Sequence, residues 1–516
     1  MILNTNNFIE QKFLDNIKFF LLLIGLLASV LQLYINTFSL NTIIILIIIN
    51  LSIIFVCKIS LIKENLIQNL FGCLILILIN FYYLSGPLII KTFLMQSIVD
   101  RLDLPFKSFL ISFCMQLSFI LSFLLIKVPN YNDKTINYRN KITYKFRAFN
   151  YFNYRKTLII FIIIVFVKTY LSLFDSGFNS YSEYGNIFLK FLYGVSEFFY
   201  IPLILIFNIY YNDKTITKKL FIFFIFLNLL LPFLYMFLIN SRGELIIAFS
   251  NILLIFIIKF IFDKDKINKK TIFYLIGCIV IFFLVFNKFS NVILEKRSDR
   301  TNETPLNLLI SSFVEMNIIE NYEMEYNSPE NYTGNMVLNR FLGIKYLDKT
   351  LIETSSYSLI EKKKFQDFSI KKMLSFLPQN FISFFNSDYR KSDYALSIGS
   401  YIERSIGINY GGGAYAKGSF ITELLLLTDS YILSFFIMVI IFYISLKIII
   451  SFQILKDKEI IYSPLIMIIG VDIIYLVSSG GLLFFVIQII RTPTQIILIY
   501  YLINLITLNK TQNIYS

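Results

Sequence analysis

The chain contains no histidine and no tryptophan among its 516 residues. Without histidine it lacks the side chain that normally titrates near neutral pH, so acid–base chemistry must use carboxylates, lysine, arginine, tyrosine or serine. Metal sites that bind through imidazole are excluded for the same reason. Without tryptophan, an aromatic belt at a membrane interface has to be built from the 34 tyrosines.

Cysteine is also scarce. The four cysteines are Cys57, Cys73, Cys114 and Cys278, and all of them fall inside apolar runs. Such positions are typical of small buried hydrophobic side chains, not of a disulfide framework or a metal cluster. We therefore expect neither a metal site nor a bound cofactor.

Apolar residues, in contrast, are abundant: they make up 57% of the chain, and the mean hydropathy is +0.69. They are concentrated in runs of about 18 or more residues, which is the length that crosses a bilayer as a helix. Because backbone groups in lipid must pair internally, such runs predict helices. The sequence therefore predicts an all-α polytopic membrane protein. We expect twelve spans, near residues 17–37, 41–58, 67–90, 106–127, 157–174, 190–211, 220–239, 245–262, 271–290, 424–450, 459–478 and 481–507.

The basic residues predict the orientation of these spans. The loop 131–156 holds seven lysines and arginines against one acid, and "NDKTITKK" (212–219) and "DKDKINKK" (263–270) are also basic. An excess of lysine and arginine marks cytoplasmic loops. With twelve spans, both termini then lie in the cytoplasm. The net charge of +14 is spread over short loops, so it indicates topology and not nucleic-acid binding.

One long segment, 291–418, then lies outside the membrane. Two stretches in it, 306–319 and 373–385, are amphipathic enough to lie along the membrane surface. We find no internal repeat and no low-complexity linker. Residues 1–516 are therefore expected to form a single integral membrane domain, with the segment 291–418 as a cap on its outer, periplasmic face.

Ionisable residues inside spans are costly and indicate function by default. In the turn "SRGE", Gly243 permits a tight reversal, while Arg242 and Glu244 lie at the outer mouth of the bundle. A local ion pair with snorkelling side chains is the simpler interpretation of this turn. The candidates of this kind are Lys168, Glu197, Arg242, Glu244, Asp472 and Arg491.

Arg491 lies beside Pro493 within the last apolar run. Because proline removes a helical hydrogen bond, the sequence predicts a broken or kinked helix there. One interpretation exposes Arg491 to a cavity at this break. The other is a shorter span with Arg491 at the outer interface, and the sequence leaves both open.

The outer segment ends in "NYGGGAYAKGSFITEL", a glycine-rich run that leads to Glu423. Such a run marks either a sharp re-entry turn, with a glutamate favoured by the helix dipole, or a close approach of the backbone to a ligand. The same segment carries arginines that are individually typical of a solvated surface. Together with Arg242 and Arg491 they can form one cationic pocket. These arginines are Arg297, Arg300, Arg340, Arg390 and Arg404.

The layout of about twelve spans with one large late loop, together with "NSRGELI", "GGGAYAKGSFITEL" and Arg491 with Pro493, resembles the O-antigen polymerases of the Wzy type. The resemblance covers most of the chain in topology but only these short motifs in residues. It implies an inverting, metal-independent glycosyltransferase of the GT-C type in the bacterial inner membrane. Its substrates would be oligosaccharide repeat units on undecaprenyl pyrophosphate, and the family leads us to expect a chain-length-regulating co-polymerase as partner.

The chemistry that the resemblance implies suits the residue types present. Pre-positioned arginines would stabilise the charge that develops on the leaving pyrophosphate. A sugar hydroxyl needs a base, which without histidine must be a carboxylate. Glu423 is the first candidate for this base and Glu244 the second. The expected pyrophosphate-binding residues are Arg242, Arg340, Arg404 and Arg491, followed by Arg300.

Two alternatives remain. A repeat-unit flippase or other transporter fits the number of spans, although transporters usually show two related halves. An O-antigen ligase would use the same donor lipid. Ligases of that type usually rely on a loop histidine, which this chain lacks.

Overall fold

The structure is a computed structural model of the chain. Apart from a few residues inside these ranges, it describes residues 2–4, 10–126, 143–174, 187–210, 216–239, 243–262, 304–315, 342–406, 419–470 and 482–506, together with Gly277, Phe289, Val292, Ile293, Tyr332, Thr333, Leu338 and Asn339.

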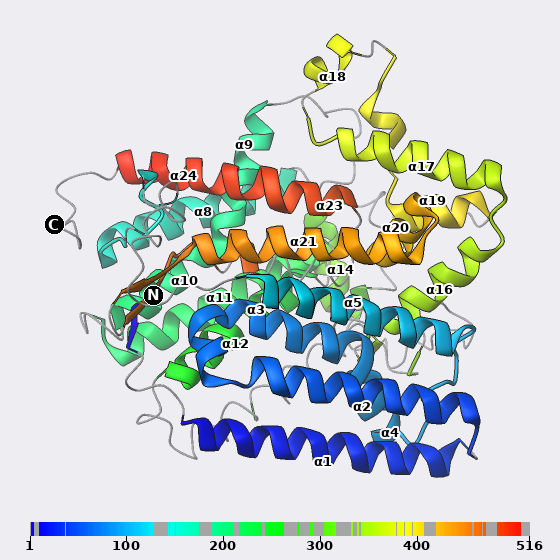
Figure 1. Cartoon of the computed structure of the whole chain (residues 1–516). Helices are drawn as coiled ribbons and strands as arrows, with labels where there is room; N and C mark the ends of the chain where they lie inside the picture. Colours follow the sequence, from blue (N-terminus) through cyan, green and yellow to red (C-terminus); the bar gives the residue numbers. More distant parts are fainter. Residues whose placement is uncertain are drawn as a thin grey trace.

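The described part is dominated by helices that run side by side in one bundle (Figure 1). In this part, nine helical segments are long and apolar enough to cross a membrane, which supports an all-α polytopic membrane protein. The helix Ile489–Leu505 is apolar but shorter. The nine segments are Gln11–Ile35, Leu40–Ser60, Lys63–Phe93, Pro105–Leu125, Tyr154–Phe174, Phe191–Asn208, Lys218–Leu238, Gly243–Phe262 and Tyr431–Ser451.

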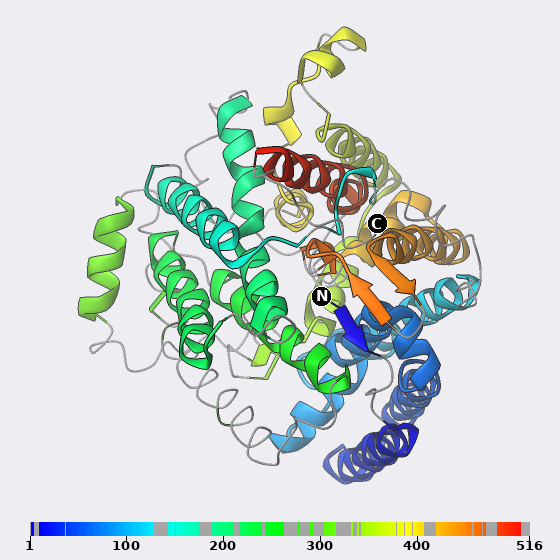
Figure 2. The ribbon, with the colours of Figure 1, turned by 90° about the vertical axis from the view of Figure 1, so that its left-hand side faces the viewer.

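The helices form two groups, which Figure 2 separates when the molecule is seen from the end that carries the sheet. The first group comprises α1 (Gln11–Ile35), α2 (Leu40–Ser60), α3 (Lys63–Asn80), the π-helical turn η2 (Phe81–Ser85), α4 (Gly86–Phe93) and α5 (Pro105–Leu125). The second comprises α8 (Tyr154–Phe174), α9 (Ile187–Ser196), the 3₁₀ turn η4 (Glu197–Tyr200), α10 (Ile201–Asn208), α11 (Lys218–Leu238) and α12 (Gly243–Phe262).

The remaining elements follow in the second half of the chain. Outside the spans lie α14 (Pro305–Glu315), α16 (Ile344–Ser355), α17 (Leu359–Leu374), α18 (Gln379–Phe385), the 3₁₀ turn η8 (Lys391–Tyr394), α19 (Ile398–Ser405) and α20 (Phe420–Thr428). The last elements are α21 (Tyr431–Ser451), the strands β2 (Gln453–Lys456) and β3 (Glu459–Tyr462), α23 (Leu482–Val486), the π-helical turn η9 (Ile487–Arg491) and α24 (Thr492–Ile506).

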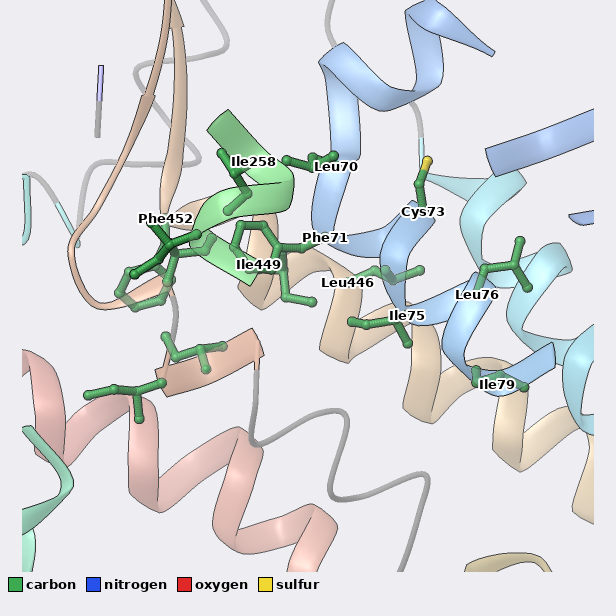
Figure 3. Close-up of a cluster of buried hydrophobic side chains, with 14 of the residues drawn as sticks. Leu70, Phe71, Cys73, Ile75, Leu76, Ile79, Ile258, Leu446, Ile449 and Phe452 are labelled. Carbon is green, nitrogen blue, oxygen red and sulfur yellow. The ribbon is translucent and has the colours of Figure 1, made fainter. Parts of the chain in front are cut away.

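One continuous apolar core joins these elements. Leu70 and Phe71 of α3 pack near Ile258 of α12 and near Leu446 and Ile449 of α21, and all of them are buried (Figure 3). α21 also packs along α5. Helix α21 therefore connects the two helix groups by burying side chains against members of both.

A small antiparallel sheet lies at one end of the bundle. β1 (Ile2–Asn4) pairs with β3, which pairs with β2, so the N-terminal strand completes a sheet begun by a hairpin near the C-terminus (Figure 2). The side-chain amide of Gln453 donates to the carbonyl oxygens of Ile67 and Gln68, at 3.2 Å each. These carbonyls lie just before Asn69, where α3 departs from helical geometry. Gln453 thereby pairs polar groups that the irregular helix leaves open.

Two of the twelve predicted spans are corrected in the described residues. A span is present in 424–450, but it begins later, as α21 (Tyr431–Ser451). The span 424–450 is divided, because α20 ends at Thr428 and Asp429 takes a left-handed conformation with φ of 49°. Ser430 then caps α21 by accepting from the Leu433 N–H. The span 459–478 begins as strand β3 and not as a helix. Apolar residues in its described part, such as Ile460, Ile466 and Ile469, are buried in the protein. An apolar composition therefore does not distinguish burial in protein from burial in lipid.

The described residues confirm one further prediction and leave others untested. The ninth span, 271–290, lies outside the described residues except for Gly277 and Phe289. The count of twelve spans and the cytoplasmic position of the termini stay predictions. Cys57 and Cys73 are buried free thiols, and Cys114 is half-buried and also free, as expected for small hydrophobic side chains.

The helices α16, α17, α19 and α20 gather toward the end of the bundle opposite the sheet (Figure 1). We call these four and α18 the outer helices. Asp348 of α16, which is fully buried, attaches this region to α5. Its carboxylate accepts from the backbone N–H groups of Asp103 and Leu104, at 2.8 Å each, and from the Ser108 hydroxyl at 2.9 Å. An outer helix therefore supplies the anion at the N-terminus of a spanning helix, where the helix dipole favours negative charge.

A second contact fixes the same region. The Gly343 N–H donates to the carbonyl of Tyr82, at 2.8 Å, within the π-helical turn η2. A Cβ at position 343 would lie 1.9 Å from the Tyr82 ring, so only glycine allows this approach. The outer region thus attaches to both η2 and α5.

We predict that Asp348→Ala lowers the free energy of unfolding by about 2 kcal/mol or more, because three donors lose a buried acceptor. The measurement is thermal unfolding of the purified protein in lipid nanodiscs. Asp367→Ala, at an exposed aspartate of α17, is the control and should change stability by less than about 0.5 kcal/mol. Equal stability of the two variants would contradict the proposed attachment.

Large apolar side chains are exposed on the outer helices. Leu359 and Ile360 begin α17, and α18 presents Phe381 and Phe384, the latter 84% exposed. The sequence predicts an amphipathic segment at 373–385, and the structure divides it between the end of α17 and α18. Exposed phenylalanines in a membrane protein are accounted for when lipid covers them.

We predict that Phe384 contacts acyl chains. Because the chain has no tryptophan, Phe384→Trp introduces a single fluorophore, and lipids brominated on their acyl chains should quench it. Phe19→Trp in α1 is the positive control, and Lys363→Trp, at an exposed lysine of α17, is the negative control. Quenching of Phe384→Trp by aqueous iodide, without quenching by brominated lipid, would disprove the contact.

Candidate functional site

Charged residues from separate helices come together within the second helix group. Lys168 of α8 donates to the Glu244 carboxylate in the first turn of α12, at 2.6 Å, and both side chains are largely buried, at 12% and 21% exposure. The Lys168 ammonium also lies 4.8 Å from the centroid of the Phe199 ring and 5.5 Å from that of Tyr235. The pair is therefore enclosed by aromatic faces, which favour a cation electrostatically.

Glu197 begins the 3₁₀ turn η4 beside this pair. Residues three apart in a 3₁₀ helix lie on the same side, so Glu197 and Tyr200 share a face. The Tyr200 hydroxyl donates to the backbone carbonyl of Glu244, at 3.4 Å. Glu197 lies within electrostatic reach of Lys168, Glu244 and Arg491. Unlike the ion pair, Glu197 has an exposed side chain.

Arg491 reaches the group from the C-terminal helix. The sequence predicts a broken or kinked helix beside Pro493. The helix from α23 to α24 is not broken there, but it passes through the π-helical turn η9, which ends at Arg491. A π-helical turn shifts the hydrogen-bond pattern, so proline is accommodated directly after it. Arg491 is exposed.

Two contacts hold this helix against the Glu197 turn. The Phe198 ring stacks on Tyr500, with centroids 6.5 Å apart and planes inclined by 13°. Gly194 lies so close to the Gln495 side chain that a Cβ would approach it to 2.0 Å. Segments about 300 residues apart in the chain therefore meet here, and α9 lies beside α24 (Figure 1). We call Lys168, Glu197, Glu244 and Arg491 the charge cluster.

Glu423, the first candidate for a base, has a different environment. It lies in α20, outside the nine spans, and is 1% exposed. Its carboxylate accepts from the backbone N–H of Leu482, at 2.7 Å, at the first residue of α23. Glu423 therefore caps a helix N-terminus from another segment, as Asp348 does for α5.

Burial raises the pKa of Glu423 to about 7, against the opposing effects of the Leu482 N–H, the Ser369 hydroxyl and the Lys372 ammonium. Burial also lowers the pKa of Lys372 to about 8, although Glu423 opposes this shift. Lys372 donates to the carbonyls of Tyr394 and Leu396, at 2.9 and 2.5 Å. These contacts join α17, α20 and α23.

The structure describes only some of the arginines of the predicted cationic pocket. Arg404 lies in α19, at the end of the bundle opposite the sheet, and is exposed; Arg390 is also exposed. Arg242, Arg300 and Arg340 lie outside the described residues, as do Arg297, Asp472 and the glycine-rich run before Ser419. Among the predicted site residues, the structure brings Glu244 and Arg491 into one cluster.

Lys168 and Glu197 were candidates as intramembrane charges but had no predicted role at the site. The signal for them was their position inside apolar runs, which does not reveal their neighbours. Within the described residues, no group of three or more carboxylates and cysteines has the arrangement of a metal site.

Comparison of the chain with family models, curated proteins and solved structures finds no match. The resemblance to the oligosaccharide polymerases therefore rests on the residues quoted above. Its functional implications stay hypotheses.

We predict that protonation of Glu423 stabilises the fold. The pKa is about 7 in the folded state and near 4.3 in an unfolded chain, so the folded state binds the proton more tightly and stability falls as pH rises through this window. Between pH 5 and 7 the loss is about 2 kcal/mol. Unfolding in nanodiscs at both pH values should show it in the wild type, and Glu423→Gln should lose this part of the dependence. The same pH slope in both proteins would contradict the prediction.

Proposed function

We propose that this protein polymerises lipid-linked oligosaccharide repeat units at the outer face of a bacterial inner membrane, as a glycosyltransferase. The observation that carries the proposal is the charge cluster, in which two cations and two carboxylates from α8, η4, α12 and η9 lie together. Ionisable groups within apolar helices of a membrane protein are costly, and they indicate a functional site by default.

The reaction needs few chemical parts. A hydroxyl of the acceptor repeat unit attacks the anomeric carbon of the growing glycan, and a new glycosidic bond forms. The bond from that carbon to undecaprenyl pyrophosphate breaks, and a carboxylate takes the hydroxyl proton. Arg491 is suited to the leaving pyrophosphate, because its planar guanidinium donates to two phosphate oxygens at once. Attack opposite the leaving group inverts the configuration at the anomeric carbon.

Aromatic side chains enclose part of the charge cluster. Aromatic rings of Phe199, Tyr200 and Tyr235 surround the Lys168 ammonium. Bound substrate would have to exclude water from the exposed Arg491, and its electrostatic interaction with developing charge would then become stronger. Excluding water would also reduce hydrolysis of the donor, which would otherwise compete with transfer.

The test is a gel of surface glycans from a strain deleted for the gene and complemented with variants. The deletion should leave carriers that bear a single repeat unit, and the wild type should restore a ladder. Arg491→Ala should lower elongation about 10²-fold or more, because one group that stabilises the leaving charge is lost. Arg491→Lys should restore it only in part, since lysine cannot donate in the same planar pattern.

A transporter of lipid-linked repeat units is the second candidate, and the π-helical turn η9 favours it. Interrupted helices near buried charges are common in transporters. The same gel distinguishes the two functions. If the deletion strain exports no repeat unit at all, export has failed, and the polymerase proposal is wrong.

A further inference from the structure

We infer that Glu197 is the general base that takes the proton of the attacking sugar hydroxyl. This inference rests on the proposed function and names a residue that motif reasoning did not select. Three carboxylates compete for the role: Glu423, Glu244 and Glu197. Their environments separate them.

Glu423 already has a structural role. It is 1% exposed and accepts the Leu482 N–H. A base must reach the hydroxyl within about 2.6–3.2 Å or through one water molecule. A carboxylate that is buried as a helix cap does not meet this condition.

Glu244 already forms an ion pair with Lys168. The 2.6 Å contact is a short charge-assisted hydrogen bond between side chains that are mostly buried. Breaking this pair to engage a substrate would leave the largely buried Lys168 ammonium without a partner, which is unfavourable. Glu244 is therefore better suited to hold Lys168 in place.

Glu197 is fixed in position, and its side chain is not covered by protein although it lies in the span Phe191–Asn208 and neighbouring helices crowd it. Its side chain is exposed, and the described residues include no hydrogen-bond or ion-pair partner for it within 4.0 Å. The turn that carries it is held on one side by Tyr200 against Glu244 and on the other by Phe198 against Tyr500. The backbone of Glu197 is thus anchored while its carboxylate is left open to substrate.

The position of Arg491 completes the argument. Glu197 and Arg491 are both exposed, and the Phe198–Tyr500 and Gly194–Gln495 contacts hold the elements that carry them against each other. In the inferred arrangement the phosphate oxygens bind Arg491 and the attacked carbon lies near Glu197. The proton moves from the acceptor hydroxyl to Glu197 as the pyrophosphate leaves with the electron pair of the broken bond.

The experiment compares Glu197→Gln, Glu197→Asp and Glu423→Gln with the wild type, in the deletion strain and as purified protein in nanodiscs. Glu64→Gln, at an exposed glutamate in the first turn of α3, is the matched control. Two quantities are measured: the rate of elongation, and the binding of undecaprenyl pyrophosphate alone. Thermal unfolding of each variant checks that it folds.

We expect Glu197→Gln to lower elongation by about 10²–10⁴-fold, to fold normally and to bind undecaprenyl pyrophosphate within about threefold of wild type. Glu197→Asp should retain part of the rate, and Glu64→Gln all of it. The rate of the wild type should fall toward acid pH as its base is protonated. The residual rate of Glu197→Gln should not show this fall. The charged and titratable groups around Glu197 are Lys168, Tyr200, Tyr235, Glu244 and Arg491.

Three results would overturn the inference while leaving the polymerase intact. Elongation by Glu197→Gln within about threefold of wild type would exclude the base. Loss of undecaprenyl pyrophosphate binding in a folded Glu197→Gln would show a role in binding instead. Loss of elongation in Glu423→Gln but not in Glu197→Gln would assign the base to Glu423.

If Glu197→Gln does not fold, Glu197→Asp decides. A rate at least tenfold lower with unchanged lipid binding supports the base, and an unchanged rate excludes it. If the wild type itself does not elongate glycans, the proposed function fails first, and the inference fails with it.

Discussion

Every backbone polar group inside the bundle needs a partner, because the hydrocarbon core of a bilayer offers no water. Regular helices meet this need internally, but this chain interrupts its helices at several places. At the irregular Asn69 of α3, the side chain of Gln453 pairs the carbonyls of Ile67 and Gln68. At the π-helical turn η2, the Gly343 N–H pairs the Tyr82 carbonyl. Distant segments thereby repair local irregularities.

The same constraint explains two buried carboxylates. Asp348 accepts from backbone N–H groups before α5, and Glu423 accepts from the first N–H of α23. Each carboxylate comes from a helix outside the spans and points at the positive end of a helix in the bundle. The outer helices are therefore attached through specific hydrogen bonds and not only through apolar contact. Glu423 was expected to act as a base, and the structure gives it this capping position.

Prediction from sequence succeeded where the signal was local. Runs such as Leu40–Ser60 and Tyr431–Ser451 are apolar on all sides, so length and composition are sufficient to identify them. Prediction failed where burial came from protein and not from lipid. Residues 459–462 form a strand at the start of a longer apolar run, and the break at Asp429 depends on a single left-handed residue. Features this short are not resolved by hydropathy averaged over the length of a span.

Composition alone decides that this chain enters a membrane, that its acid–base chemistry cannot use histidine, and that its buried charges are few and costly. Which of those charges meet is a different matter. The members of the charge cluster are separated by up to about 300 residues: they are Lys168, Glu197, Glu244 and Arg491. The sequence around each one does not indicate that the others lie nearby. Only the packing of α8, η4, α12 and η9 brings them together, since contacts between distant segments follow from how whole helix surfaces fit. The same packing leaves Glu197 exposed and buries Glu423, so one carboxylate lies at the surface of the protein and the other holds the fold.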